Sequence, residues 1–192
     1  MKTLIHYNKQ RLEELINRLS LLNTLYIDRS FSFDAQLIDF MRESEMLFEE
    51  LGESGKVSQV SQLNIYFVTA QKGINPQTLE KLRIGKRENI WIASYHVLDG
   101  MSDLMQASIM KVEGEISQAT ELIEQVILSV IQSGLIGDVD LKELHDQESI
   151  KKLWNNLTQN EQVKLIERKL KLSVMQDDII IICDKVCSRI NA

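Results

Sequence analysis

The chain has 192 residues, of which 44% are hydrophobic, and these values fit one domain, or one domain with an appendage, that buries a sizeable core. Eight glycines and one proline argue against a turn-rich β fold. The formal net charge of −6 argues against broad nucleic-acid binding, because such binding needs a basic surface. The start lacks a signal-peptide pattern, and the apolar run from Ile179 to Cys183 is too short to span a membrane. We therefore expect a soluble, cytoplasmic protein, with export by a signal-less route left open.

Helical spacing of apolar residues begins near the N-terminus and predicts three helices in succession. The first runs from Lys2 to about Ile27, and the second follows Ser32, which is placed as an N-cap. A glycine-containing turn at residues 51–56 separates it from a third, shorter helix that ends at Gly73. The residues expected to face inward are Leu12, Leu15, Leu19, Leu22, Tyr26, Phe33, Leu37, Phe40, Leu47, Leu51, Val60, Leu63, Phe67 and Ala70.

Asn75 before Pro76 has the pattern of a cap and a first-turn proline, so a further helix is predicted to begin there. Gly85, among basic residues, predicts a kink or a short break. The stretch from Ile90 to Leu98 carries apolar groups around more than half of the helix, and we expect it to be enclosed on several sides.

From Leu98 to Val130 the apolar residues recur every three or four positions, which predicts one long helix with a narrow, coiled-coil-like apolar stripe. A helix of that length measures about 50 Å, whereas a compact chain of this size is roughly 40 Å across. An elongated molecule is therefore expected. The stripe consists of Leu98, Met101, Met105, Ile109, Val112, Ile116, Ala119, Ile123, Val126 and Val130.

Gly134 and Gly137 are predicted to end the long helix. A fifth helix follows, and the capping-box spacing of Thr158 and Glu161 predicts the start of a sixth, which runs to about Ile190. The periodicity changes phase near Leu170. The apolar positions of these two helices are Leu141, Leu144, Ile150, Leu153, Trp154, Val163, Ile166, Leu170, Leu172, Met175, Ile179, Ile182, Val186 and Ile190.

The predicted fold is all-α, an elongated helical bundle of about six helices with one long central coiled-coil-like helix. We expect residues 1–137 to form a helical bundle that includes the long helix. Residues 138–192 are expected to form a C-terminal helical pair that packs on it, unless residues 1–192 are one single domain.

Residue types that hold metals do not form a recognisable site in the sequence. His6, His96 and His145 lie far apart, and no Glu-x-x-His pair of the di-metal bundle type is present. The acidic tract at residues 138–148 fails the EF-hand template at its glycine and final glutamate positions. The two cysteines, 183 and 187, lie on one helical face and are predicted to be reduced core thiols. No metal and no cofactor is predicted.

Catalytic motifs are also lacking, since the sequence contains no phosphate-binding loop, dinucleotide fingerprint or nucleophile elbow. We therefore predict a non-catalytic protein, a subunit or adaptor of a larger assembly, whose partner is another protein or a second copy. The predicted interaction surface combines aromatic residues with two basic clusters. It consists of Arg83, Lys86, Arg87, Trp91, Tyr95, Lys164, Arg168 and Lys171.

Two alternatives stay open at this point. The chain could be a membrane-active or signal-less secreted helical protein, although the segment from Glu121 to Leu135 lacks the basic polar face of an interfacial helix. The fifth and sixth helices also have the outline of a helix-turn-helix, so a DNA-binding protein is the second alternative. Glu161 and Glu167 dilute the basic face that this function would need.

Overall fold

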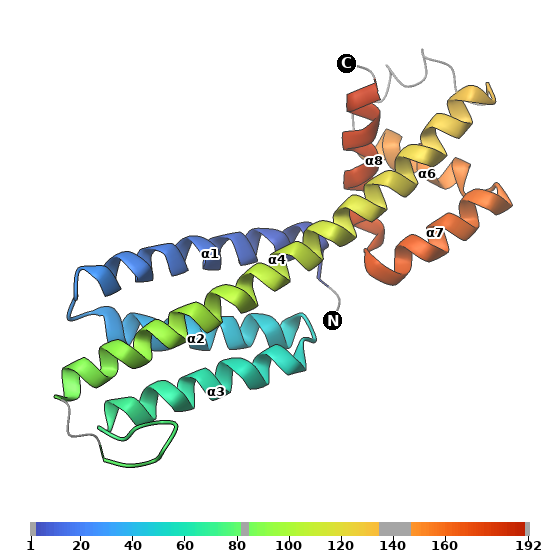
Figure 1. The fold of residues 1–192 in the computed structure, drawn as a ribbon. Helices are drawn as coiled ribbons and strands as arrows, with labels where there is room; N and C mark the ends of the chain where they lie inside the picture. Colours follow the sequence, from blue (N-terminus) through green and yellow to red (C-terminus); the bar gives the residue numbers. More distant parts are fainter. Residues whose placement is uncertain (1–2, 82–84, 135–146, 191–192) are drawn as a thin grey trace. The chain divides into compact units, whose positions relative to one another are not determined.

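The computed structural model describes residues 3–81, 85–134 and 147–190, with the exception of the Lys86 side chain. Helices hold 84% of these residues, and the described part of the chain contains no strand (Figure 1). The predicted all-α fold is therefore confirmed, with seven described helices in place of about six. They are α1 (Ile5–Ile27), α2 (Phe33–Glu50), α3 (Ser54–Gln71), α4 (Lys86–Gln132), α6 (Gln147–Leu157), α7 (Glu161–Ser173) and α8 (Gln176–Ile190).

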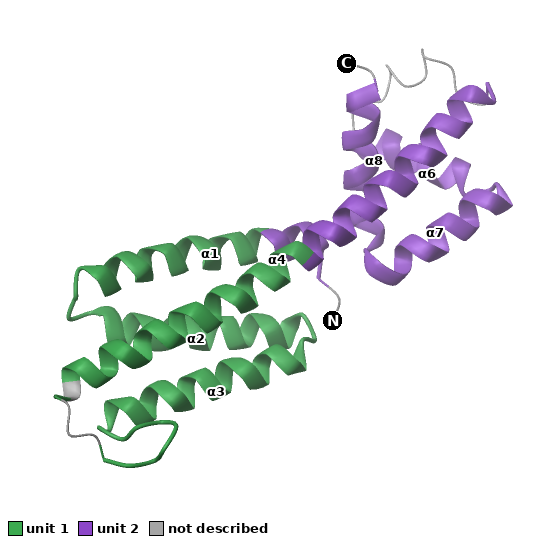
Figure 2. Cartoon of the chain, viewed as in Figure 1, with its two compact units in different colours: residues 1, 10–110 green, residues 2–9, 111–192 purple. Residues whose placement is uncertain are grey.

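The contacts of the chain divide it into two compact units (Figure 2). Unit 1 comprises residues 1 and 10–110, and unit 2 comprises residues 2–9 and 111–192. Both α1 and α4 therefore contribute residues to each unit. The predicted domain boundary at residue 137 lies outside the described residues and stays a prediction.

Unit 1 is a bundle of α2 and α3 with the larger part of α1 and the first half of α4, lying side by side (Figure 1). Its core is rich in aromatic side chains, because four phenylalanines, at positions 33, 40, 48 and 67, have no exposed surface. Of the inward positions predicted in the first three helices, all are buried except Tyr26, Leu51 and Leu63, which are half-buried.

Two features position α4 against α3 inside unit 1, a side-chain hydrogen bond and a close approach of the two helices at a glycine. The buried Asn89 side chain donates a 2.7 Å hydrogen bond from Nδ2 to the Ala70 carbonyl oxygen, which also accepts the backbone N–H of Gly73 at 2.9 Å just after the end of α3. Further along, a Cβ atom placed on Gly100 would lie 3.1 Å from both terminal carbons of Leu63. The absence of a side chain at Gly100 therefore lets the two helices approach closely.

The apolar stripe of α4 is confirmed in both units. Unit 1 buries Leu98, Met101 and Met105, and unit 2 buries Val112, Ala119, Ile123, Val126 and Val130. Ile109 and Ile116 are half-buried, so the stripe is partly open at these two positions. The helix continues through Gly100 and Gly114 as predicted.

Unit 2 is held together around a buried carboxylate, Asp178, in the first turn of α8. Asp178 Oδ2 accepts the backbone N–H groups of Ile5, at 3.0 Å, and Met175, at 3.1 Å. Its Oδ1 accepts the backbone N–H of His6 at 3.5 Å and lies 3.2 Å from His6 Nδ1. One side chain therefore satisfies orphan donors at the start of both α1 and α8, where the helix dipoles favour a negative charge.

Other contacts join the remaining helices of unit 2. Trp154 of α6 has no exposed surface and donates from Nε1 to Glu167 of α7 at 3.4 Å. Arg189 of α8 pairs with Glu124 of α4 at 2.7 Å. The side chains of α8 at positions 179, 182, 183, 186 and 187 are all buried, which places one face of that helix in the core.

One predicted helix start in unit 1 is wrong, and another is right in position but lacks the expected capping hydrogen bond. No helix begins at Pro76, because Asn75 Oδ1 instead accepts the backbone N–H groups of Gln77 and Thr78 and forms a local turn. Ser32 does occupy the N-cap position of α2, but its backbone is already helical there and its hydroxyl makes no capping bond. The Ser32 hydroxyl accepts from Gln36 Nε2 at 3.0 Å instead.

The predicted sixth helix is in fact two helices, α7 and α8, separated at Val174 and Met175. The phase change near Leu170 was the sign of this break, and it leaves Leu172, predicted to be apolar and inward, 80% exposed. The N-cap of α7 also lies two positions after the predicted one. Asn160, rather than Thr158, accepts the backbone N–H of Gln162, at 2.9 Å.

Candidate interaction surface

The structure separates the predicted surface residues into two groups. Arg87, Trp91 and Tyr95 lie in the first turns of α4 in unit 1, one helical turn apart. The second group, at positions 164, 168 and 171, lies on α7 in unit 2. Arg83 and the Lys86 side chain lie outside the described residues. The two basic groups therefore belong to different units of the chain.

Trp91 is half-buried in a cluster of aromatic rings between α1, α2 and α4. Its ring stacks on Tyr26, with centroids 5.4 Å apart and planes inclined by 14°. It also lies 5.6 Å from the buried ring of Phe33. Such contacts give aromatic pairs stability beyond the area that they bury. Trp91 thus has one edge in the core of unit 1 and one edge at its surface.

Phe31, in the connection between α1 and α2, is the most exposed large apolar side chain of the described residues, at 92%. The Arg87 guanidinium lies over its ring, 4.9 Å from the centroid. Arg87 also donates from Nη2 to the Arg29 carbonyl oxygen at 3.3 Å. These two contacts hold an exposed aromatic ring in a defined place on the surface.

The exposed residues continue along α4. Tyr95 is 64% exposed and Ile92 is 57% exposed, so the expectation that residues 90–98 are enclosed on several sides is wrong for this face. The opposite face of this part of α4 is packed in the core, where Val97 and Leu98 are buried. We name Phe31, Arg87, Trp91 and Tyr95 the Phe31 surface. Phe31 was missed in the sequence because it stands between helices, where periodicity carries no signal.

A titratable group lies close to this surface. Burial raises the pKa of the Asp34 carboxyl above its usual value, while a hydrogen bond with Gln71 and the charge of Arg87 partly oppose this rise. Asp34 therefore gives Arg87 an acidic neighbour within unit 1.

The basic residues of α7 are largely engaged by carboxylates on the same helix. Lys171 Nζ lies 3.0 Å from Glu167, and Lys164 Nζ lies 3.5 Å from Glu161. Arg168 is exposed. The face therefore carries mixed charge, which is a weaker electrostatic footprint for DNA than an uninterrupted basic face.

Candidate metal ligands and thiols do not converge in the part of the chain that the structure describes. No group of three His, Cys, Asp or Glu residues there could hold a metal ion. Cys183 and Cys187 are buried and free, as predicted. Their mutual hydrogen bond, together with burial, raises the pKa of the Cys183 thiol, which is therefore a poor nucleophile.

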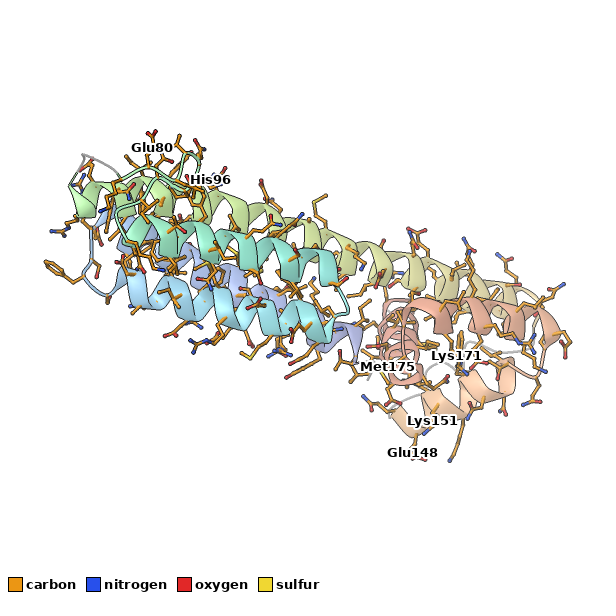
Figure 3. The ribbon with its side chains drawn as sticks, turned by 90° about the horizontal axis from the view of Figure 1, so that it is seen from below. Glu80, His96, Glu148, Lys151, Lys171 and Met175 are labelled. Atoms are coloured by element: carbon orange, nitrogen blue, oxygen red, sulfur yellow. The ribbon has the colours of Figure 1, made fainter. Side chains whose placement is uncertain are left out.

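The three histidines have different surroundings. His96 lies on α4 (Figure 3). Its ring centroid is 4.8 Å from that of Tyr66, and it lines a groove of about 480 Å³ between α3 and α4. His6 is the partner of Asp178, and His145 lies outside the described residues. The other residues that line the groove are Gln59, Gln62, Leu63, Gly100, Asp103 and Leu104.

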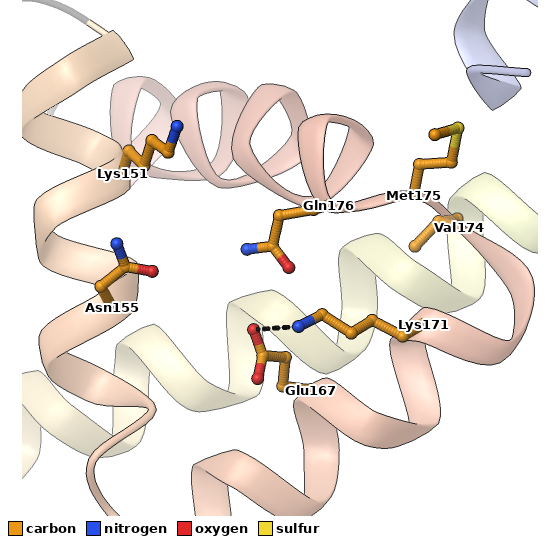
Figure 4. A pocket seen from close by; sticks show the side chains of 7 residues that line it. All are labelled: Lys151, Asn155, Glu167, Lys171, Val174, Met175 and Gln176. Atoms are coloured by element: carbon orange, nitrogen blue, oxygen red, sulfur yellow. Dashed lines mark ion pairs between the residues drawn. The ribbon is translucent and has the colours of Figure 1, made fainter.

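A second pocket lies within unit 2, between α6, α7 and the start of α8 (Figure 4). It has a volume of about 460 Å³. The sequence indicated only Lys171 at this place, because the pocket depends on the break between α7 and α8. Its lining residues are Lys151, Asn155, Glu167, Lys171, Val174, Met175 and Gln176.

Comparison of the chain with protein-family models, with curated proteins and with solved structures finds no match. Among the described helices, none is both long enough and apolar enough to cross a bilayer. The function is therefore inferred from the geometry of the chain alone.

Proposed function

We propose that this chain is a non-catalytic interaction protein, a subunit or adaptor that docks a protein partner through the Phe31 surface. The observation that carries the proposal is the Phe31 ring, which is almost fully exposed and yet held by Arg87. Exposing a large apolar ring to water is unfavourable, so an aromatic ring held in place at the surface is typical of a docking site.

The composition of the Phe31 surface supports this function. Tryptophan, tyrosine and arginine are the residues that most often dominate the binding energy of protein interfaces. Here Trp91 and Tyr95 are spaced by one helical turn, and Arg87 precedes Trp91 by the same interval. Because Trp91 is stacked on Tyr26 and Arg87 is hydrogen-bonded, these side chains lose little freedom when a partner binds.

The partner expected for this surface presents an apolar centre with carboxylates around it. Apolar atoms would cover Phe31 and Tyr95, and a carboxylate would pair with the exposed guanidinium of Arg87. A second copy of the chain also offers carboxylates, since it has 28 acidic and 22 basic residues. Either occupant makes the chain part of a protein assembly.

The test compares two substitutions of exposed apolar residues in unit 1. Phe31→Ala removes the proposed contact, whereas Ile65→Ala changes a 67% exposed side chain on α3 outside the Phe31 surface. Sedimentation velocity measures self-association, and a pull-down from native cells measures binding of another protein. We expect Phe31→Ala to weaken one of these at least tenfold, the loss typical of a dominant interface residue, and Ile65→Ala to leave both unchanged.

Circular dichroism and thermal melting provide the folding control. Phe31 buries almost no surface, so both variants are expected to melt within a few degrees of the parent chain. Equal association of the parent chain and Phe31→Ala in both assays contradicts the proposal.

A further inference from the structure

We propose that the exposed face of α7 binds the surface of an anionic lipid bilayer. This face consists of Leu165, Arg168, Lys169 and Leu172, and we name it the Leu165 face. It belongs to unit 2, whereas the Phe31 surface belongs to unit 1, so the inference is independent of the docking function. On this proposal the helix lies along the bilayer surface and does not cross it.

The four residues of the Leu165 face share one side of the helix, because they are three or four positions apart. Leu165 is 61% exposed and Leu172 is 80% exposed. They are two helical turns apart, about 10 Å along the axis. Arg168 and Lys169 lie between them, one turn from each leucine, and both are exposed. Apolar and cationic side chains therefore alternate along one exposed line.

The opposite side of α7 is packed within unit 2. Val163 and Leu170 are buried there. Glu167 also lies on that side, since its side chain is only 15% exposed, accepts a hydrogen bond from Trp154 and lines the pocket shown in Figure 4. The Leu165 face is therefore presented by a helix that is already folded and held, and binding does not require α7 to leave its place.

The charge of α7 favours an anionic partner. The helix has four basic and two acidic residues, whereas the whole chain has 22 basic and 28 acidic residues. Two of its lysines pair with the two glutamates. Arg168 and Lys169 form no ion pair with any described residue, so the two cations of the Leu165 face are open to the phosphates and carboxylates of lipid head groups.

The two leucines distinguish a bilayer from other anionic partners. Single-stranded nucleic acids stack on aromatic side chains, which α7 lacks. A helix that enters a groove of a protein presents apolar anchors at successive turns, whereas here cations occupy the turn between the leucines. At a bilayer surface, leucines enter the boundary between head groups and acyl chains. The long side chains of Arg168 and Lys169 reach the head groups from the same depth.

The first test is co-sedimentation of the full chain with lipid vesicles. One set contains equimolar phosphatidylserine and phosphatidylcholine, and the other contains phosphatidylcholine alone. We expect binding to the neutral vesicles to be at least tenfold weaker, because the attraction of the cations is then absent. Binding to the anionic vesicles should also weaken as the salt concentration rises from about 0.1 M to about 1 M. Absence of binding to the anionic vesicles overturns the proposal.

Charge variants assign the binding to α7. The double variant Arg168→Gln, Lys169→Gln is expected to weaken binding to the anionic vesicles about 25-fold, since each basic residue near such a surface contributes about fivefold. Lys185→Gln is the control, because Lys185 is exposed on α8 in the same unit and is not part of the Leu165 face. Circular dichroism verifies that the variants are folded. Equal binding of the double variant and the control overturns the proposal.

A fluorescence measurement tests whether the leucines enter the lipid. Leu172→Trp places a tryptophan on the Leu165 face, and Ile65→Trp places one at a 67% exposed position of α3 in unit 1. Emission of each variant, relative to the parent chain, is recorded with anionic vesicles that contain brominated phosphatidylcholine. We expect the tryptophan at position 172 to be quenched and that at position 65 to be unaffected. Vesicle binding without quenching at position 172 means contact through charge alone, as with an acidic protein, and overturns the bilayer assignment.

Discussion

The two units of the chain differ in how their helices are fastened. Unit 1 relies on apolar fit, with four phenylalanines fully buried and Gly100 allowing α3 and α4 to approach closely. Unit 2 relies on a charged group, because the buried Asp178 carboxylate ties the first residues of α1 to the start of α8. A core of the first kind tolerates small changes of shape, whereas a buried charge has no substitute once a partner is lost.

The largest effect is expected when the carboxylate of unit 2 is removed. Asp178→Ala leaves the backbone N–H groups of Ile5 and Met175 without their acceptor, and we expect a loss of about 4 kcal/mol in the free energy of unfolding. Chemical denaturation measures this value. Hydrogen exchange of the Ile5 amide should accelerate, and an unchanged exchange rate there would show that α1 begins without Asp178.

A smaller and graded effect is expected along the stripe of α4 in unit 2. Ile123 has no exposed surface, and Ile123→Ala should cost about 3 kcal/mol. Ile116 is half-buried, and Ile116→Ala should cost about 1 kcal/mol, because part of its side chain already meets water. Denaturant unfolding of the two variants measures the difference. Equal losses would mean that the stripe is as closed at position 116 as at position 123.

Substitution of the two glycines of α4 by alanine compares how closely this helix is packed in the two units. A Cβ at Gly114, in unit 2, meets nothing within 4 Å, so Gly114→Ala should stabilise the chain by about 1 kcal/mol through helix propensity. Gly100→Ala, in unit 1, gains the same helix propensity, but its new Cβ atom would lie only 3.1 Å from the terminal carbons of Leu63. We expect its melting temperature to stay near or below that of the parent chain. If both variants gain equally, α3 and α4 are not in close contact at this point.

The smallest effect is a pH dependence in unit 1. The folded-state pKa of Asp34 is raised, so the folded chain holds this proton more tightly than the unfolded chain does. The stability that this group contributes is present below its unfolded pKa, near 3.8, and is lost as the pH rises through the higher folded pKa. Asp34→Asn should therefore gain stability relative to the parent chain between pH 3 and pH 6. A constant difference in melting temperature across this range would contradict the expected sign.

The long helix and most of the core could be predicted from the sequence, because periodic burial along one face leaves a direct record in residue spacing. The carboxylate of Asp178 could not, since its partners at positions 5 and 6 are adjacent only in the folded chain. The turn at Asn75 could not be predicted for a different reason. The same residue that caps a helix also closes a local turn, and the local sequence favours both.

The candidate surface was predicted in part. Trp91 and Arg87 were indicated by composition and spacing on a helix, but Phe31 joins them through a contact across 56 positions of the chain, and no local pattern marks it. The basic residues of α7 were grouped with them by charge alone. The structure assigns these residues to another unit and pairs two of them with glutamates.

The most direct test of the docking function is photo-crosslinking in native cells from benzoylphenylalanine placed at position 31. Position 65, which is exposed on α3 in the same unit, carries the probe as a control. The proposed function predicts one discrete crosslinked protein product from position 31, lost when Arg87→Ala is added, and no discrete product from position 65. Equal yields from the two positions, or no product from position 31, would contradict docking through the Phe31 surface.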